Sequence, residues 1–156
     1  MEKPNSLRAE IIKHLPELAE NPDKLTMFIS NGRIIAHKAT LGHTTEFTLT
    51  ILITDFTGDQ NILRTVIIYW LQANQPDILQ PGQTPNDAIT FDADILSNDT
   101  VDLLIQLKLS ERTTALIDDK HQIHISHPAE PQHITDLTGI LGAQWGKGEN
   151  WKPSNE

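Results

Sequence analysis

The segment Ile89–Leu109, ITFDADILSNDTVDLLIQLKL, contains two alternating runs that are separated by a polar turn. Apolar side chains occupy every second position on both sides of this turn: Ile89, Phe91, Ala93, Ile95, Val101, Leu103, Ile105, Leu107 and Leu109. A period of two is typical of a strand that buries one face, and Asn98-Asp99 favours a chain reversal. The segment therefore predicts an antiparallel hairpin in a sheet with one buried face.

Upstream residues extend the same sheet. His43–Thr54 alternates apolar and mostly threonine positions, which predicts a long strand that is buried on one side. Before it, Leu25–Ser30 and Arg33–Thr40 flank Asn31-Gly32, a pair that readily adopts positive φ. We therefore predict a second hairpin, with its tight turn at Asn31-Gly32.

Downstream residues predict one more strand pair, formed by Glu111–Ile117 and His121–His127 around Asp118-Asp119. The complete sheet would then be antiparallel and twisted, with about six or seven strands. Because helical patterns also occur in the chain, the predicted fold class is α+β, in a single domain with two packed helices.

Two segments carry the helical patterns. In Gln60–Gln75, apolar residues recur with helical spacing and Asp59 stands at the N-cap position, so this helix is expected to pack across the sheet. Trp70 belongs to its apolar stripe and is predicted to be a core residue. Near the N-terminus, Asn5 and Ser6 are predicted to cap an amphipathic helix that ends at Pro16.

The chain of 156 residues fits one domain, which we place at residues 1–130. Residues 131–156 contain several glycines and prolines and predict a flexible or assembly-ordered tail. Trp145 and Trp151 in this tail are candidate anchors for a partner protein, since tryptophan is common in interface hot spots. Incidental tryptophans in a disordered tail explain the same pattern.

Charge disfavours several classes of partner. The formal net charge is -9, which opposes nonspecific binding to nucleic acid or to anionic membranes. Between Lys38 and Lys108 the only lysine or arginine is Arg64, whereas nine carboxylate residues occur there. Any surface built from this section is expected to be negative. Met1–Leu15 predicts neither a signal peptide nor a membrane span, so we expect an intracellular, soluble protein.

Candidate chemical groups have simpler structural explanations. Asp92, Asp94 and Asp102 are predicted to share the polar face of the hairpin; we interpret this as a solvated sheet face rather than a cation or catalytic site. The histidines from His121 to His133 have unsuitable spacing for a metal site. The chain has no cysteine, no nucleophile elbow and no phosphate-binding loop. We therefore predict no catalytic residues, metal or cofactor.

Several short motifs, in order, resemble the phage tail completion protein R (GpR) family over approximately Met1–Pro131. The motifs near the N-terminus are Pro4-Asn5-Ser6-Leu7-Arg8, His14-Leu15-Pro16-Glu17-Leu18, Asn21-Pro22-Asp23-Lys24-Leu25 and Asn31-Gly32-Arg33-Ile34. Those that follow are Thr54-Asp55-Phe56 with Gly58-Asp59, Trp70-Leu71 with Asn74-Gln75-Pro76, Asp94-Ile95-Leu96-Ser97-Asn98, and Leu107-Lys108-Leu109-Ser110-Glu111-Arg112.

The resemblance implies a tail-terminator-like fold and a non-enzymatic role: a structural virion protein that completes the tail at its head-proximal end and enables head–tail joining. The implied partners are further copies of the chain in a ring, expected to be a hexamer, together with tail tube, sheath and head–tail connector proteins. Assembly would take place in the cytoplasm of the bacterial host. Sheet edges or the helix Gln60–Gln75 are candidate ring contacts, and Asp92, Asp94 and Asp102 are expected to face the channel and repel DNA.

Three alternatives remain open from the sequence. An assembly chaperone would use the same sheet surfaces without staying in the finished particle. A small ligand-binding module is a second alternative, since an α+β domain can contain a pocket. An unrecognised hydrolase is the third, because fold alone does not determine chemistry.

Overall fold

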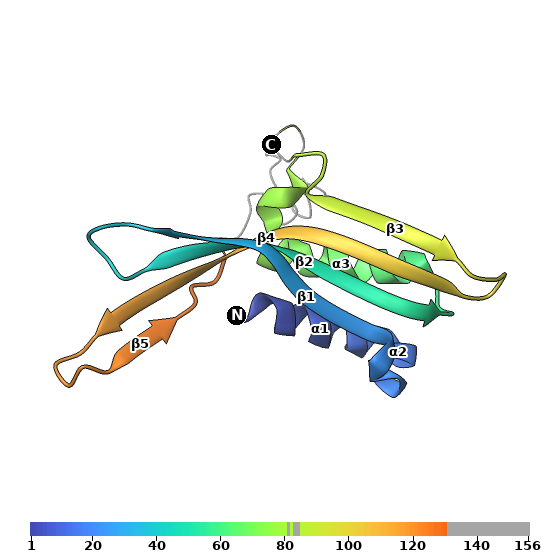
Figure 1. Cartoon of the computed structure of the whole chain (residues 1–156), viewed down its shortest axis with the longest axis horizontal. Coiled ribbons are helices and arrows are strands. Elements are labelled where there is room, and N and C mark those ends of the chain that lie inside the picture. The colour runs from blue at the N-terminus through green and yellow to red at the C-terminus, as the bar shows by residue number, and fades with distance from the viewer. Residues whose placement is uncertain (81, 83–84, 131–156) are drawn as a thin grey trace, which may run out of the picture.

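The computed structural model describes residues 1–80, 82 and 85–130, which form an antiparallel sheet with helices on one face (Figure 1). The strands are β1 (Leu25–Ala36), β2 (His43–Phe56), β3 (Ile89–Ile95), β4 (Val101–Ile117) and β5 (Ile123–Ser126). The helices are α1 (Lys3–His14), α2 (Pro16–Glu20) and α3 (Gln60–Asn74), with short 3-10 turns η1 (Pro22–Lys24) and η2 (Pro76–Leu79). The predicted α+β fold with an antiparallel sheet is confirmed.

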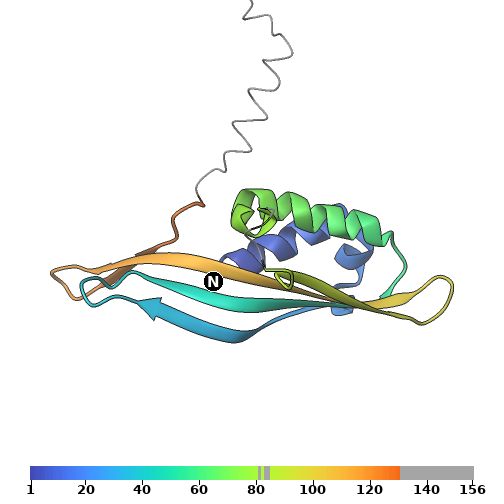
Figure 2. The same ribbon diagram turned by 90° about the horizontal axis from the view of Figure 1, so that it is seen from above.

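Four strands lie side by side in the order β1-β2-β4-β3, and β5 pairs with the end of β4. All pairings are antiparallel. Within the described residues β1 and β3 are therefore the two outer strands of the main sheet. Figure 2 shows that the helices form one layer on one side and leave the other side of the sheet uncovered.

The core lies between this helix layer and the sheet. Alternate residues of β2 and β4 point toward the helices, and the cross-strand partners Leu49 and Leu107 are both fully buried at its centre. Helix α1 contributes Leu7 and Ile11, and α3 contributes Trp70 among others. The prediction that Trp70 is a core residue is confirmed, and its indole nitrogen donates a hydrogen bond to Ser6 Oγ at 2.9 Å.

Both predicted helices are confirmed, α2 is a third helix that was not predicted, and one predicted cap is wrong. Asp59 accepts a hydrogen bond from the Asn61 backbone N–H at 2.8 Å, as an N-cap residue does. Pro16 ends the N-terminal helix and begins α2. The prediction that Asn5 and Ser6 cap α1 is wrong, because that helix begins at Lys3, one turn earlier, and its first N–H groups are bonded by a residue of β4.

The predicted hairpin turn at Asn31-Gly32 is also wrong. Asn31 has a φ of 52°, as expected, but this conformation produces a bulge inside one continuous strand. Residues on both sides of the bulge pair with β2, Ser30 with Thr48 and Arg33 with Glu46. Because β2 is long enough to pair with both halves, β1 continues to Ala36 before the chain turns.

The two predicted strands Val101–Leu109 and Glu111–Ile117 are likewise one strand, β4. Alternation continues through the polar residues, since Glu111 and Thr113 are buried on the helix side. With both mergers the predicted six or seven strands become five. The predicted reversals at Asn98-Asp99 and Asp118-Asp119 are confirmed, and they connect β3 to β4 and β4 to β5.

A carboxylate on α2 holds the end of β2. Glu17 accepts hydrogen bonds from the Thr57 backbone N–H and hydroxyl, and from Lys24 Nζ at 2.8 Å. Partial burial raises the pKa of the Glu17 carboxyl, but the hydrogen bonds from Lys24 and Thr57 outweigh burial and leave the pKa below its ordinary value of 4.5.

The lowered pKa of Glu17 predicts acid sensitivity. The folded state binds this proton less readily than the unfolded chain, so the stabilisation is complete above about pH 4.5 and is lost as the pH falls through the lower folded value. The urea midpoint of each protein is measured at about pH 6 and at about pH 3.5. We expect the midpoint of Glu17→Gln to fall less between these two pH values than the midpoint of the wild type. The exposed Glu20→Gln is the control, and equal losses in wild type and Glu17→Gln would contradict the prediction.

Candidate assembly surfaces

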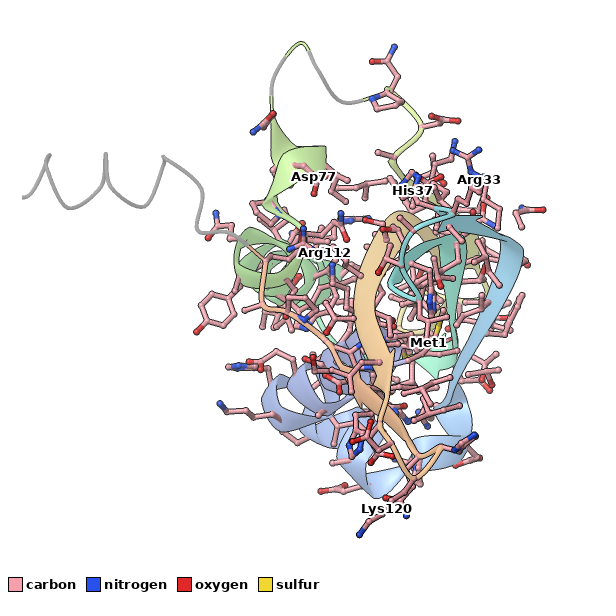
Figure 3. All side chains as sticks on the ribbon, turned by 90° about the vertical axis from the view of Figure 1, so that its left-hand side faces the viewer. Met1, Arg33, His37, Asp77, Arg112 and Lys120 are labelled. Atoms are coloured by element: carbon pink, nitrogen blue, oxygen red, sulfur yellow. The ribbon has the colours of Figure 1, made fainter. Side chains whose placement is uncertain are left out.

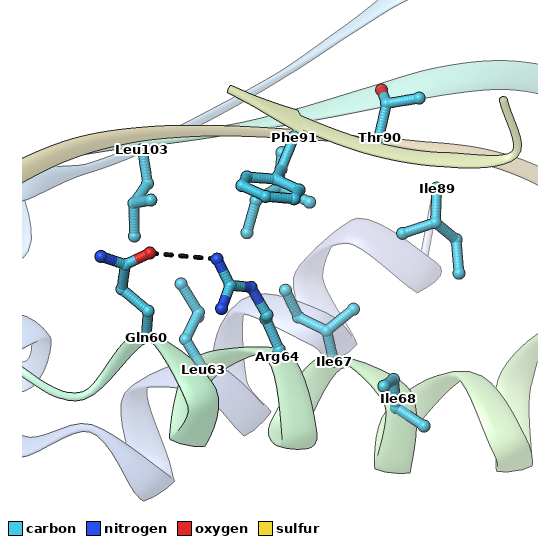
Figure 4. Close-up of a pocket in the computed structure, with 10 residues that line it drawn as sticks. Gln60, Leu63, Arg64, Ile67, Ile68, Ile89, Thr90, Phe91 and Leu103 are labelled. Atoms are coloured by element: carbon cyan, nitrogen blue, oxygen red, sulfur yellow. Dashed lines mark hydrogen bonds between the residues drawn. The ribbon is translucent and has the colours of Figure 1, made fainter. Parts of the chain in front are cut away.

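An apolar groove lies between α3 and the outer strand β3, on the helix side of the sheet (Figure 4). Its volume is about 160 Å3, comparable to a cavity that holds a benzene molecule. The walls come from α3, β3 and β4, and they include Ile67, Ile68, Ile89, Phe91 and Ile105. Because Ile89 and Phe91 are 39% and 55% exposed, the groove opens to solvent as an unfilled apolar surface.

Arg64 is the charged residue of this groove. Its guanidinium donates hydrogen bonds to Gln60 Oε1 at 3.0 Å and Asn61 Oδ1 at 3.2 Å, and its Cζ lies 4.7 Å from the centre of the Phe91 ring. No carboxylate among the described residues forms an ion pair with it. The sequence shows that Arg64 is the only lysine or arginine between Lys38 and Lys108. Only the structure shows that it lies beside an apolar groove.

Two hairpin arms extend beyond the helix layer at the end of the sheet away from the β3–β4 turn (Figures 1 and 2). One is the β1–β2 hairpin and the other is the β4–β5 hairpin. Figure 3 shows this end of the molecule, with His37 and Lys120 near the two tips on opposite sides of the view. The arms therefore diverge, and each presents its own surface to a neighbouring molecule.

The β4–β5 arm has one strongly apolar face. Ile117 pairs directly with Ile123, and Ala115 pairs with Ile125, so these side chains share one face of the hairpin. Ile117, Ile123 and Ile125 are 52%, 65% and 59% exposed. We call these three residues the isoleucine face. Strand alternation in β4 places it on the same side of the sheet as the helices.

The predicted acidic residues come together on the opposite side of the sheet. Asp94 is the cross-strand partner of Asp102, and Asp92 lies two residues before Asp94, so all three share the face that the helices leave uncovered. Asp102 also has a local contact, because its Oδ1 accepts a hydrogen bond from the Asp55 N–H at 2.9 Å. Asp55 has a φ of 51° at the irregularity in β2, so Asp102 stabilises this part of the backbone.

A buried polar cluster joins the N-terminus of α1 to β4. Glu111 Oε2 accepts hydrogen bonds from the backbone N–H groups of Glu2 and Lys3, at 2.6 and 2.9 Å. Lys3 Nζ donates to Gln75 Oε1 and to the Ser110 carbonyl, both at 2.7 Å. Burial lowers the pKa of Lys3, and nearby carboxylates offset part of that effect. Since the Glu111 carboxylate and the Lys3 ammonium both bond protein groups, we interpret the cluster as structural.

The remaining candidates do not converge on a site. His124 contacts Asp118 at 2.7 Å, whereas His127 lies near Thr113 and Glu2. The described residues contain no group of three His, Asp or Glu side chains placed to hold a metal ion. Trp145 and Trp151 lie outside the described residues. Within the described ranges, no helix has the length and apolar character needed to cross a membrane.

These surfaces define a class of protein. An outer strand beside an unfilled apolar groove, and an arm with exposed isoleucines, are surfaces suited to contact with other proteins. The class is therefore a single-domain α+β protein with exposed apolar surfaces suited to protein–protein contact.

Comparison with known proteins places the chain within this class. The family model of the P2 phage tail completion protein R (GpR) matches residues 1–131. The tail completion protein R of Escherichia phage P2 is 36% identical over 153 residues, which cover 93% of this chain and 99% of that protein. No solved structure shows a significant match. The chain belongs to the P2 phage tail completion protein R family.

Family membership gives the chain a structural role in phage tail completion. The resemblance inferred from the short motifs is thereby confirmed. A protein with this role contacts other components of the tail, and its place is the virion tail. The groove, the isoleucine face and the acidic face are the surfaces that the structure offers for such contacts.

Proposed function

We propose that copies of this chain close the head-proximal end of the tail as a ring, a hexamer, which enables the head to join. The observation that carries the proposal is the family match over residues 1–131. The shape of the subunit supports it, because the groove and the isoleucine face lie on different parts of one molecule. Distinct surfaces of this kind form heterologous contacts, which close into rings.

The expected neighbours are the last tail tube subunits, the end of the sheath and the connector proteins of the head. Assembly takes place in the cytoplasm of the bacterial host, and the ring stays in the finished particle. The second arm, β1–β2, is available for one of these partners, because Ile34 and Leu41 near its end are 72% and 54% exposed.

The uncovered sheet face is proposed to face the channel. Asp92, Asp94 and Asp102 lie together there, and the negative potential from six copies would keep passing DNA from adhering to the wall. The double substitution Asp92→Lys and Asp94→Lys is expected to leave the tail assembled but to slow DNA ejection at low salt. Asp102 is kept because it bonds the backbone of Asp55.

A phage carrying a deletion of the gene tests the role. Electron microscopy of the lysate is expected to show separate heads and tails, and adding purified protein is expected to restore joined particles. Antibody labelling of complete particles should place the protein at the head-proximal end of the tail. Joined infectious particles without the protein would contradict the proposal, and its absence from complete particles would favour an assembly chaperone instead.

A further inference from the structure

Arg64 and Asp119 are two of the charged residues that form no ion pair among the described residues. Arg64 bonds only neutral oxygens and the Phe91 ring, at the groove between α3 and β3. Asp119 is exposed in the turn of the β4–β5 arm, and its carboxylate makes no hydrogen bond or ion pair within the described ranges. Its neighbour Asp118, in contrast, is held by His124.

Each of these charges lies beside exposed apolar surface. Arg64 borders a groove whose walls are mainly aliphatic side chains and Phe91 (Figure 4). Asp119 follows Ile117 by two residues, and the isoleucine face begins there. The groove therefore offers an apolar surface with a cation beside it, and the arm offers an apolar surface with the Asp119 carboxylate in its turn, next to the exposed Lys120.

The two surfaces lie on different parts of the subunit but on the same side of the sheet. Ile89 and Phe91 pair with Leu107 and Ile105, which point toward the helices. The isoleucine face continues this side of β4 past the helix layer, at the end of the sheet that carries the arms. A contact between them joins unlike surfaces of two molecules, as a ring requires.

We propose that the β4–β5 arm of one copy docks into the α3–β3 groove of the next copy. Ile117, Ile123 and Ile125 cover the apolar groove, and Asp119 pairs with Arg64 across the contact. This inference rests on the proposed ring and names the interface that closes it. The apolar contact supplies the driving force, while the ion pair fixes orientation and selects the partner.

Charge reversal tests the ion pair. Arg64→Glu and Asp119→Arg are each expected to weaken self-association by roughly 10- to 100-fold, because each places like charges together at the contact. The double variant restores the pair in reverse and is expected to recover most of the loss. Native mass spectrometry and light scattering over a concentration series measure this, and thermal melts check folding. The control is Lys13→Glu at an exposed position away from the groove. It changes the net charge by the same amount as Arg64→Glu and should have little effect on self-association.

Crosslinking tests the apolar contact independently. The chain has no cysteine, so an introduced pair reports only the designed contact. A mixture of Phe91→Cys copies with Ile123→Cys copies is expected to give a disulfide-linked dimer under mild oxidation, whereas neither variant alone should. Ile34→Cys on the other arm replaces Ile123→Cys in the control mixture.

The outcomes separate this interface from the proposed function. If Arg64→Glu self-associates as the wild type does, or if the double variant is no better than the single ones, the interface is wrong although the role in the tail stands. If Arg64→Glu still self-associates but is lost from tails, the groove binds a different tail protein and the inference is overturned. If deletion of the gene leaves particles complete, the proposed function itself fails.

Discussion

Replacing Glu111 with alanine is expected to lower the free energy of unfolding by about 3 kcal/mol. The carboxylate accepts the N–H groups of Glu2 and Lys3, and α1 has no side-chain cap of its own sequence. Without it, the positive end of α1 is left buried against β4, next to the Lys3 ammonium. The loss should therefore exceed that of an ordinary cap residue.

Urea denaturation at neutral pH measures this change, and Glu111→Gln is the matched control. Glutamine keeps an acceptor oxygen at nearly the same position but lacks the charge, so its loss is expected to be about half as large. A Glu111→Ala variant as stable as the wild type would show that the N-terminus of α1 does not depend on this contact. In Glu111→Ala, amide hydrogen exchange at the first turn of α1 is expected to become faster as the stability falls.

Truncation of both Leu49 and Leu107 to alanine is expected to leave little folded protein at 37 °C. The two side chains are fully buried cross-strand partners beneath the helix layer. Each Leu→Ala change in such a site costs about 2–5 kcal/mol, while a single domain has only about 5–15 kcal/mol in total. Each single variant should fold with a clearly lower urea midpoint.

The matched control is Ile34→Ala on the β1–β2 arm. Ile34 is 72% exposed, so its truncation is expected to change stability by less than about 0.5 kcal/mol. The double variant is best followed by circular dichroism on heating, with the two single variants measured beside it. Cooperative unfolding of the double variant near the wild-type temperature would mean that this pair is not the centre of the core.

In the proposed ring, the contacts of the buried polar cluster at Lys3 and Glu111 would hold the candidate assembly surfaces in place. The Lys3 and Gln75 side chains bond the Ser110 backbone on the edge of β4 that β3 no longer covers. This edge lies between the groove and the β4–β5 arm along the same strand. A variant that loosens the cluster is therefore expected to weaken self-association as well as stability.

Local patterns were sufficient wherever the structure depends on neighbours in the sequence. The alternation in Val101–Leu109 and His43–Thr54 correctly predicted strands with one buried face, and helical spacing correctly predicted α3 with its Asp59 cap. The run Ile89–Ile95 forms the predicted strand, but the expectation that its apolar residues are buried is wrong, because none of the residues of this outer strand is buried. The acidic residues at positions 92, 94 and 102 were correctly placed on one face, since strand alternation alone fixes that relation.

Sequence reasoning failed where one pattern fits two structures. Positive φ at Asn31 suits both a hairpin turn and a bulge, and only pairing of both flanking segments with β2 decides between them. Glu111 interrupts an apolar alternation and so suggests a strand boundary. Its actual role is to cap a helix whose first residue lies 108 positions earlier in the chain.

The sequence by itself therefore determined the α+β class, the orientation of the strand faces, the acidic character of the middle section and the family. Tertiary structure alone decided that five strands form instead of the predicted six or seven, that Arg64 borders an apolar groove, and that Ile117, Ile123 and Ile125 remain exposed on an arm. The physical reason is that periodicity records which side of an element is buried. It does not record which distant segment covers that side, and long-range packing makes that choice.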